Sequence, residues 1–182
     1  NLMSLIDRPT SGSITIDNKR IDFTNSKKND FLRAKKIGII YQQDNLLSDF
    51  TAIENIYLAS LAAGNKKESS ITKSKILLRK VGLTSRSNHY PSQLSGGEKQ
   101  RVSIARALAF DADILLMDEP FGALDEIVRD YLNEQLLKLW HSTSKTICFV
   151  THSIPEAVYL STKIVVMSPR PGRIIDIIES DL

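Results

Sequence analysis

A single cysteine, Cys148, is present among the 182 residues, so no internal disulfide framework is possible. This scarcity is typical of a reducing compartment, and the apolar run TICFVT around Cys148 predicts a buried, inert thiol. Long hydrophobic runs are also missing, since none approaches the about 20 residues that a membrane-spanning helix needs. The sequence shows no signal-peptide pattern. We therefore expect neither a disulfide-stapled secreted protein nor a membrane-spanning one.

An excess of charge of one sign is absent as well. The net charge is only +3, from 24 Lys and Arg against 21 Asp and Glu. The basic residues stand in separated pairs at 27–28, 35–36 and 66–67, which favours a solvated surface over a nucleic-acid-binding stripe. With 42% hydrophobic and 25% charged residues, the composition is that of an ordinary globular protein, and we expect no nucleic-acid partner.

Strands and helices alternate in the C-terminal part of the sequence. Strand-like runs lie in DILLMDEP, KTICFVTH, TKIVVMSP and GRIIDIIE, and helical patterns lie in DEIVRDYLNEQLLKLW and SIPEAVYLS. This alternation predicts an α/β core with a largely parallel sheet. We assign residues 109–182 to the C-terminal part of that core.

The first half begins with strand patterns and continues with helical ones. Two short alternating runs around Asp17 and Asn18 predict a hairpin, and KKIGIIYQQ predicts a buried strand. Three helical segments follow, the second of which, at 71–83, ends near Gly82. The other two open with capping boxes, Thr51 with Glu54 and Ser95 with Glu98. We therefore predict that residues 44–108 form an α-helical subdomain, which follows residues 1–43 of the core.

Two adjacent carboxylates end the run ILLMDEP. A continuous apolar run predicts a strand buried on both faces of a parallel sheet, and such sheets bind ligands at the carboxyl ends of their strands. Asp118 and Glu119 fall at this end. Because adjacent strand side chains point to opposite faces, one carboxylate could hold Mg²⁺ while the other orients a nucleophilic water. On its own, the pair could equally well cap the next segment.

The stretch LSGGEKQR combines a helix start with two glycines. A capping box between Ser95 and Glu98 does not explain Gly96 and Gly97, because glycine is unfavourable in the first turn of a helix. Glycines let backbone N–H groups approach a ligand closely, and a helix N-terminus with exposed N–H groups binds anions. The pattern favours a phosphate site, with a simple helix cap as the alternative.

Two other predicted strands end in polar side chains. His152 follows FVT, and its strand should neighbour that of Asp118, so the imidazole could reach the same phosphate. Gln42 follows IGIIY, and its carbonyl could bind Mg²⁺ or water. Taken alone, a histidine such as His152 is more often structural than catalytic, and a glutamine such as Gln42 is more often an ordinary loop amide.

In this order and spacing, these features resemble the nucleotide-binding domain of ABC transporters over essentially the whole chain. Gln42 matches the family's Q-loop, LSGGE its signature motif, ILLMDE its Walker B strand, GALD its D-loop and His152 its switch histidine. The resemblance implies an α/β fold of the P-loop NTPase (RecA-like) type. This fold has a mainly parallel sheet, a small antiparallel β part and an α-helical subdomain.

The resemblance also implies hydrolysis of ATP with Mg²⁺ in a head-to-tail dimer. Asp118 and Gln42 would hold the metal, Glu119 would polarise the attacking water, and His152 would contact the γ-phosphate. Asp125 would link the two sites across the interface. The residues that would bind the ATP of the second copy are Ser95, Gly96, Gly97 and Glu98.

One expected part of the phosphate site does not occur in the sequence. In that family the glycine-rich P-loop, G-x-x-x-x-G-K-[ST], directly precedes the segment that NLMSLIDRPTSG resembles. Neither this motif nor the aromatic residue that stacks on adenine is present. We therefore expect an N-terminally truncated domain, which does not bind ATP appreciably when isolated.

Within the family, the two halves of the sequence resemble different subgroups. DEPFGALDE and THSIPEAVYLSTKIVVMSPRPGRI look like the ATPases of nitrate, sulfonate and taurine importers, whereas RPTSGSITIDNKRIDF and IGIIYQQDNLLSDFTAIENI look closer to lipoprotein-release and macrolide-export ATPases. The importer-like stretch is longer and more particular, so import of a small solute is favoured over export or a chimeric sequence. The implied partners are transmembrane permease subunits, a second copy and a solute-binding protein, at the cytoplasmic face of the plasma membrane.

Three other classes of protein fit less well. Translation-factor ATPases have a motif similar to EPTNHLD at the position where this chain has EPFGALD. Relatives in DNA repair and chromosome organisation carry long coiled coils, for which the interval between Gln42 and Leu94 leaves no room. The presence of Glu119 and His152 argues against a catalytically dead regulatory module.

Overall fold

The computed structural model describes residues 2–42, 44–122, 124–141 and 145–180. Its strands are β1 (Thr15–Ile16), β2 (Lys19–Arg20), β3 (Ile37–Ile40), β4 (Ile114–Asp118), β5 (Thr146–Val150), β6 (Lys163–Met167) and β7 (Ile174–Glu179). Its α-helices are α1 (Ser26–Lys36), α2 (Ala52–Ala62), α3 (Lys67–Lys80), α4 (Gly96–Ala109), α5 (Glu126–His141) and α6 (Ile154–Leu160). Single 3-10 turns lie at Thr84–Arg86 and Pro91–Gln93.

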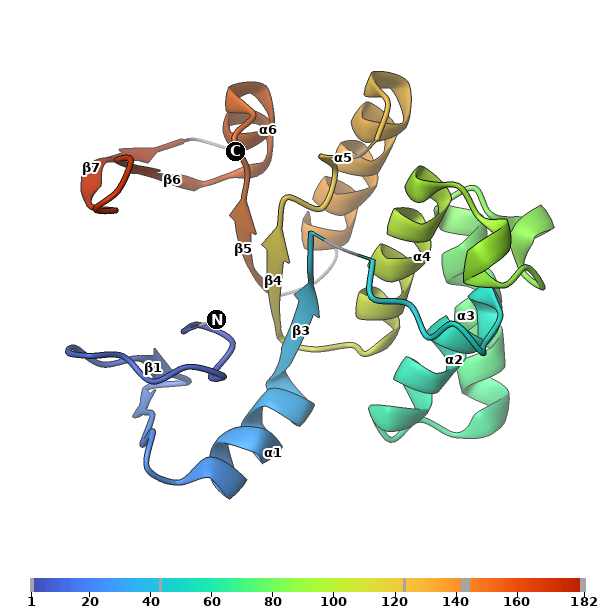
Figure 1. Cartoon of the computed structure of the whole chain (residues 1–182), viewed down its shortest axis with the longest axis horizontal. Helices are drawn as coiled ribbons and strands as arrows, with labels where there is room; N and C mark the ends of the chain where they lie inside the picture. The colour runs from blue at the N-terminus through green and yellow to red at the C-terminus, as the bar shows by residue number, and fades with distance from the viewer. Residues whose placement is uncertain (1, 43, 123, 142–144, 181–182) are drawn as a thin grey trace.

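A parallel sheet in the order β3-β4-β5 forms the centre of the molecule. Its strands are rich in Ile, Leu and Val, which fit a pleated and partly buried surface. The register places Ile40 opposite Met117, and Met117 opposite Phe149. Because the strands are parallel, their carboxyl ends meet at one edge of the sheet (Figure 1).

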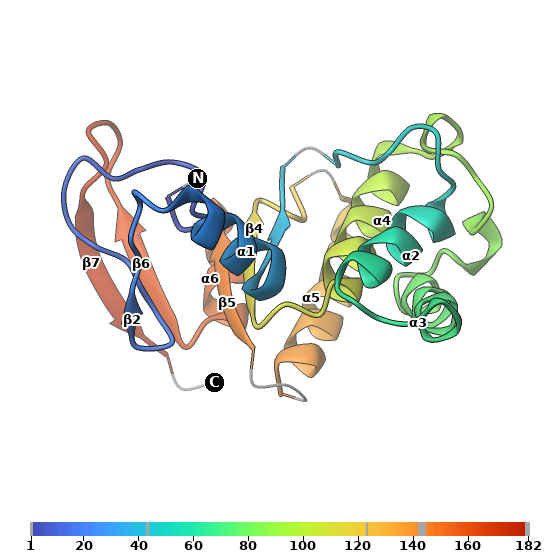
Figure 2. The ribbon, with the colours of Figure 1, turned by 90° about the horizontal axis from the view of Figure 1, so that it is seen from below.

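Helices α2, α3 and α4 pack together at one end of the molecule, and β2, β6 and β7 lie at the other end (Figure 2). The predicted capping boxes are present at the starts of α2 and α4. Gly82, with φ 71°, follows the end of α3, as its sequence pattern predicts. In the described part of the chain, none of the helices has the length and apolar character needed to cross a membrane.

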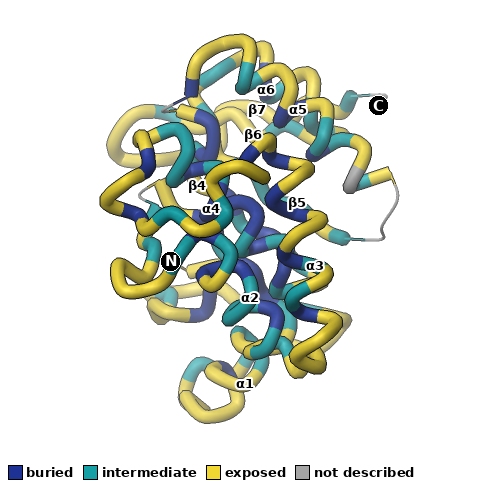
Figure 3. The backbone as a smooth tube through the Cα atoms, turned by 90° about the vertical axis from the view of Figure 1, so that its right-hand side faces the viewer, coloured by how far each residue is buried: buried dark blue, intermediate teal, exposed yellow. Residues whose placement is uncertain are grey.

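The sheet is buried more completely on one face than on the other. Leu115 and Met117 are 1% and 2% exposed and belong to the main core cluster, together with residues of α4 and α5. Ile114 and Leu116, which point to the opposite face, are only half-buried. The prediction of a strand buried on both faces is therefore wrong for β4, because an apolar run alone does not reveal which face a neighbouring element covers. In Figure 3, buried residues, coloured dark blue, lie along α2, α4 and β4 in the interior of the molecule.

Cys148 on β5 lies on the less covered side and is half-buried, so the prediction of a buried thiol is also wrong. Its Sγ lies 3.8 Å from Sδ of Met3 in the N-terminal segment. Partial burial raises the pKa of the Cys148 thiol, because the charged thiolate loses solvation. A raised pKa keeps the group protonated near neutral pH, in agreement with the low reactivity expected from the sequence.

Two antiparallel hairpins flank the parallel sheet. The β1–β2 hairpin turns at Asp17 and Asn18, whose φ angles of 50° and 58° suit a two-residue turn, and this confirms the prediction. Strands β6 and β7 pair with each other and form a separate sheet among the described residues. Many of their apolar side chains are exposed, namely Val165, Val166, Met167, Ile174, Ile175, Ile177 and Ile178.

Candidate functional site

The predicted carboxylate pair lies at the carboxyl edge of the parallel sheet. Asp118 is the last residue of β4, and the Glu119 amide donates a hydrogen bond to the Val150 carbonyl at 2.9 Å, which extends the pairing with β5 by one residue. Glu119 has φ 45°, in the left-handed region that residues with a side chain rarely occupy. Such conformations persist only where neighbouring structure imposes them, and they cluster at functional sites.

Three of the predicted site residues come together around the Glu119 carboxylate. Its Oε1 lies 3.1 Å from His152 Nδ1, and its Oε2 accepts a 3.5 Å hydrogen bond from Gln42 Nε2. The side chain of Glu119 is 30% exposed and that of His152 is 76% exposed. The three ends of β3, β4 and β5 thus bring an amide, a carboxylate and an imidazole into one open cluster, which we call the strand-end cluster. A water beside it would face both a hydrogen-bond acceptor and a titratable imidazole.

The donor set for a divalent cation consists of oxygen atoms at this same edge. Asp118 is exposed, and the carbonyl oxygen of Gln42 is separate from the amide nitrogen that contacts Glu119. Among the described residues, no group of three or more His, Cys, Asp or Glu side chains could hold a metal ion by itself. Carboxylate and carbonyl oxygens of the kind that Asp118 and Gln42 offer are ligands that Mg²⁺ uses, together with waters and substrate phosphates.

The signature segment, residues 94–98, leads into α4, and the predicted capping box is present in the structure. The Ser95 hydroxyl accepts a hydrogen bond from the Glu98 amide at 3.3 Å, and the Ser95 amide donates to Glu98 Oε2 at 2.8 Å. The Ser95 amide and the guanidinium of Arg86, at 3.0 Å, lower the pKa of Glu98. Glu98 therefore has a structural role within its own chain, as the capping alternative predicts.

Capping does not account for the two glycines. A Cβ atom at Gly96 would meet no atom within 4 Å, and this residue does not adopt a left-handed φ. A Cβ atom at Gly97 would lie 3.3 Å from Leu124 Cδ2, so the signature helix packs closely on the loop that contains Asp125. Packing among the described residues does not require glycine at position 96, and the role of Gly96 in binding a phosphate stays a prediction.

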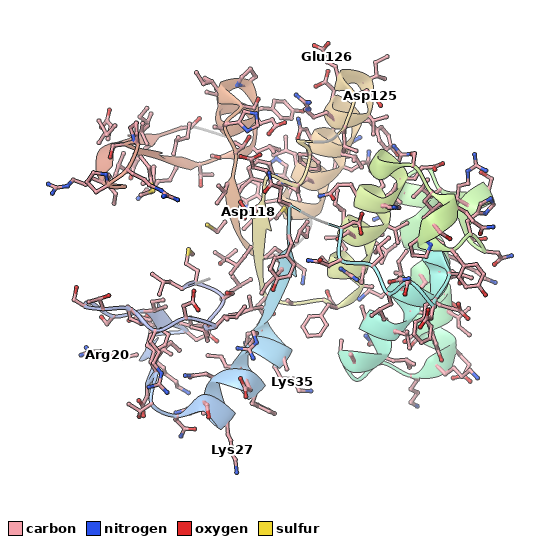
Figure 4. The ribbon with its side chains drawn as sticks, viewed as in Figure 1. Arg20, Lys27, Lys35, Asp118, Asp125 and Glu126 are labelled. Carbon is pink, nitrogen blue, oxygen red and sulfur yellow. The ribbon has the colours of Figure 1, made fainter. Side chains whose placement is uncertain are left out.

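Asp125 lies apart from the strand-end cluster. Its Oδ1 accepts a hydrogen bond from the Val128 amide at 3.0 Å and so caps the start of α5. Figure 4 shows Asp125 and Glu126 at the outer end of α5, away from Asp118 at the edge of the sheet. Ala123 of the predicted D-loop lies outside the described residues. The structure therefore places Gln42, Asp118, Glu119 and His152 at one edge of the sheet, whereas Asp125 and the segment of Ser95, Gly96 and Gly97 are not in contact with that cluster among the described residues.

Two arginines that no sequence motif indicates hold the loops around these residues. Arg106 on α4 donates to the backbone carbonyls of Asn45 and Asp44, at 2.7 Å and 3.0 Å, and so fixes the loop that follows Gln42. Burial lowers the pKa of Arg106. Arg129 on α5 donates to the Leu124 carbonyl at 3.0 Å. Neither contact could be found from sequence, because each arginine binds a backbone group whose position depends on the tertiary fold.

Comparison with known proteins identifies the family. The family described as ABC transporter matches residues 1–122, which is more than half of the chain. The chain belongs to the ABC transporter family. The predicted resemblance is thereby confirmed.

The relatives of this ABC transporter chain include import proteins. It is 43% identical over 166 residues to the taurine import ATP-binding protein TauB of Rhizobium johnstonii, a match that covers 91% of the chain and 60% of the relative. It is 40% identical over 165 residues to the trimethylamine N-oxide transport system ATP-binding protein of Pelagibacter ubique, covering 91% of the chain and 48% of the relative. The chain thus spans less than two thirds of the length of these relatives.

A solved structure supports the same fold. The dimeric structure of a post-hydrolysis state of an ATP-binding cassette bound to ADP and Pi is 32% identical, with a TM-score of 0.86 over 98% of this chain and 78% of the other. The predicted P-loop NTPase type of fold, with a mainly parallel sheet, small antiparallel sheets and helices, is confirmed for this ABC transporter chain.

Proposed function

We propose that this ABC transporter chain is the catalytic part of an ATP-binding subunit that couples ATP hydrolysis to solute transport. The observation that carries the proposal is the strand-end cluster, in which Glu119 Oε1 lies 3.1 Å from His152 Nδ1 at the edge where parallel sheets bind ligands. Phosphoryl transfer needs positioning and charge stabilisation rather than covalent chemistry, and these groups supply both. ADP and Pi are the ligands of the similar cassette structure.

In this proposal, the residues of the cluster have different tasks. Glu119 accepts a hydrogen bond from the attacking water and increases its nucleophilicity. His152, as an imidazolium with an N–H on each ring nitrogen, donates one hydrogen bond to Glu119 and the other toward the γ-phosphate. Gln42 holds the other oxygen of Glu119 through its amide nitrogen. With Asp118 and the carbonyl of Gln42 as its protein ligands, Mg²⁺ would neutralise phosphate charge.

The signature segment serves a second copy of the chain. Ser95 and Gly96 are exposed at the start of α4, and the backbone N–H groups of the first helical turn are a site for phosphate. Because packing against the described residues does not require a glycine at position 96, we assign Gly96, together with Ser95 and Gly97, to the ATP of the opposite copy. Asp125 would couple the two sites at the interface. The similar cassette structure with ADP and Pi is itself a dimer.

The transport direction that we favour is import of a small solute of the nitrate, sulfonate or taurine type. The named functions of the two relatives, taurine import and trimethylamine N-oxide transport, support this choice, but their similar identities of 43% and 40% do not favour one solute. The partners would be transmembrane permease subunits and a solute-binding protein, with the chain at the cytoplasmic face of the plasma membrane. The alternative is a lipoprotein-releasing or macrolide-export system, because residues 8–23 and 37–56 look closer to the ATPases of that group. A neighbouring gene for a solute-binding protein would support import, and one for a permease with a large extracytoplasmic domain would support export.

The test uses the chain joined at its N-terminus to the family's P-loop segment, which we call the extended chain. Glu119→Gln in the extended chain should retain ATP binding and form a stable ATP-bound dimer on size exclusion. Its hydrolysis rate should fall by about 10²–10⁴-fold, the usual contribution of a positioned base. Asp118→Asn should instead weaken Mg²⁺-dependent nucleotide binding, because a neutral amide is a poorer ligand for a hard cation.

The two amide variants are matched controls for each other, since each removes one charge from neighbouring positions. Hydrolysis by Glu119→Gln at near the wild-type rate would contradict the role of Glu119. Accumulation of the ATP-bound dimer by Asp118→Asn instead would show that the two roles are exchanged.

A further inference from the structure

A buried carboxylate holds the loop that carries His152. Glu156 on α6 is 6% exposed, and its Oε2 accepts a hydrogen bond from the Thr151 hydroxyl at 2.6 Å. The same hydroxyl oxygen accepts the Ser153 amide at 3.0 Å, and the Ser153 hydroxyl accepts the Glu156 amide at 3.4 Å. His152 thus lies inside a closed set of hydrogen bonds, while its own side chain stays 76% exposed.

One guanidinium connects this loop to the loop before α5. Arg129 Nε lies 3.5 Å from Glu156 Oε1, and Arg129 Nη2 donates to the Leu124 carbonyl at 3.0 Å. Leu124 is 5% exposed and directly precedes Asp125. Leu124 is also the residue on which Gly97 of the signature helix packs. The chain of contacts therefore runs from the loop of His152 to the loop of Asp125 through two side chains.

The chemistry of this pair indicates a positional role. The side chains of Arg129 and Glu156 are 32% and 7% exposed, so the carboxylate has lost most of its hydration, and a pair of this kind is weak evidence for a role in fold stability alone. The carboxylate of Glu156 accepts a hydrogen bond from Thr151 on one oxygen, and its other oxygen lies 3.5 Å from Arg129 Nε, a buried nitrogen that makes no hydrogen bond among the described residues. A planar guanidinium can contact a carboxylate and a carbonyl at once in fixed geometry, whereas a lysine ammonium is a single point charge.

We propose that Thr151, Arg129 and Glu156 form a loop clamp that fixes the His152 loop relative to the Asp125 loop. Among the contacts of the described residues, no side-chain atom of these three residues reaches the side chains of Gln42, Glu119 or His152, so the three are positioning residues and not catalytic residues. This inference rests on the proposed function for its effect on hydrolysis. If the clamp holds His152 at the distance that lets it meet Glu119, its loss should lower kcat and leave the KM for ATP unchanged, because ATP binding relies on other groups.

The first experiment compares Thr151→Val with Thr151→Ser in the extended chain. Valine keeps the volume and branching of threonine but removes the hydroxyl, whereas serine keeps the hydroxyl. We expect Thr151→Val to lower kcat about tenfold with KM within about twofold, since small misplacements of a reacting group carry costs of this size. Thr151→Ser should retain kcat within about threefold. Arg129→Lys should resemble Thr151→Val, and the double variant should be no worse than the poorer single one, because residues in one network are not additive.

A second readout does not depend on ATP hydrolysis. Hydrogen exchange of the Val128 and Arg129 amides, which bond to Asp125, should become several times faster in Thr151→Val. These amides lie across the clamp from the substituted hydroxyl, so a purely local defect would leave their exchange unchanged. Glu134→Gln is the control, because it removes a carboxylate from α5 that pairs only with the exposed Lys138 in the described contacts.

The outcomes separate the clamp from the proposed function. Unchanged exchange at Val128 and Arg129 in Thr151→Val overturns the clamp, whatever the ATPase activity. The clamp is equally overturned if Thr151→Val and Thr151→Ser lose kcat to the same extent, or if the losses in Thr151→Val and Arg129→Lys are additive. An extended wild-type chain that hydrolyses no ATP would contradict the proposed function, while exchange across the two loops would still decide whether the clamp exists.

Discussion

The backbone conformation of Glu119 could not be predicted from the sequence. Its φ of 45° is held by two hydrogen bonds, from its amide to Val150 on β5 and from the Gly122 amide to its carbonyl at 3.2 Å. Such a conformation costs about 1–3 kcal/mol, which the surrounding ladder and turn must offset. The result is that the Glu119 side chain leaves the pleat of β4 and meets His152. Backbone strain at this residue is thus tied to the geometry of the strand-end cluster.

Gly38 illustrates a residue whose identity is fixed by packing. A Cβ atom there would lie 2.8 Å from Leu115 Cδ2 and 3.4 Å from Ala112 Cβ, in the tight contact between β3 and β4. We predict that Gly38→Ala lowers the free energy of unfolding by about 1–3 kcal/mol, the usual cost of overpacking a core. Urea unfolding of the 182-residue chain would measure this change.

Gly96→Ala is the matched control, because a Cβ atom at Gly96 would meet nothing within 4 Å. Its free energy of unfolding should stay constant or rise by up to about 1 kcal/mol, since alanine favours a helix more than glycine does. Equal destabilisation by the two substitutions would contradict the packing argument for Gly38. In the extended chain, the same Gly96→Ala should reduce ATP-driven dimerisation, because the added methyl would hinder close approach of a phosphate.

At the scale of elements, the cap at the start of α4 involves Ser95, whose effect on stability and whose effect on dimerisation can be measured separately. Ser95→Ala should lower the free energy of unfolding by about 0.5–2 kcal/mol, because the Glu98 amide loses its acceptor. Ser95→Asn should cost little stability, since asparagine caps helices as well as serine does. Its larger side chain should nevertheless block ATP-driven dimerisation of the extended chain, measured by size exclusion. Dimerisation retained in Ser95→Asn but lost in Ser95→Ala would show that the serine acts only as a cap.

The elements that could be predicted are those with local patterns. The capping boxes gave the starts of α2 and α4, and Asp17 with Asn18 gave the turn of the first hairpin. The strand-end cluster could be predicted from the positions of the strand ends, because parallel strands place their carboxyl ends at one edge of the sheet. For Gln42, Glu119 and His152, sequence position was therefore enough to predict proximity.

Other features depend on contacts that sequence position does not encode. Helix α1 was not predicted, because its residues are mostly basic or polar and no apolar stripe marks it; its start is capped by Asn25, which accepts the Lys28 amide at 3.1 Å. The antiparallel pairing of β6 with β7, and the half-burial of Leu116, reflect which neighbours cover a strand. The partners of Arg106 and Arg129 include backbone carbonyls, which leave no trace in residue type.

At the scale of the whole molecule, the strand-end cluster and the signature segment point to different ligand positions. The cluster gathers at the sheet edge, whereas Ser95 bonds with Glu98 at the start of its own helix. A single chain would therefore offer one set of groups to each of two nucleotides, in line with the proposed dimer. Hydrolysis would then depend on the approach of two copies, which is how transport could be coupled to closure.

The last prediction concerns the 182-residue chain by itself. It contains no glycine-rich P-loop, and the strand-end cluster alone offers one carboxylate and few cationic groups to a triphosphate. Calorimetry should therefore detect no saturable ATP binding, whereas the extended chain, as the matched control, should bind. The apolar side chains of β6 and β7, such as Ile175 at 65% and Met167 at 60% exposure, should also bind the dye ANS. Micromolar ATP binding by the 182-residue chain would contradict this expectation, because it would require a phosphate site built entirely from the residues described.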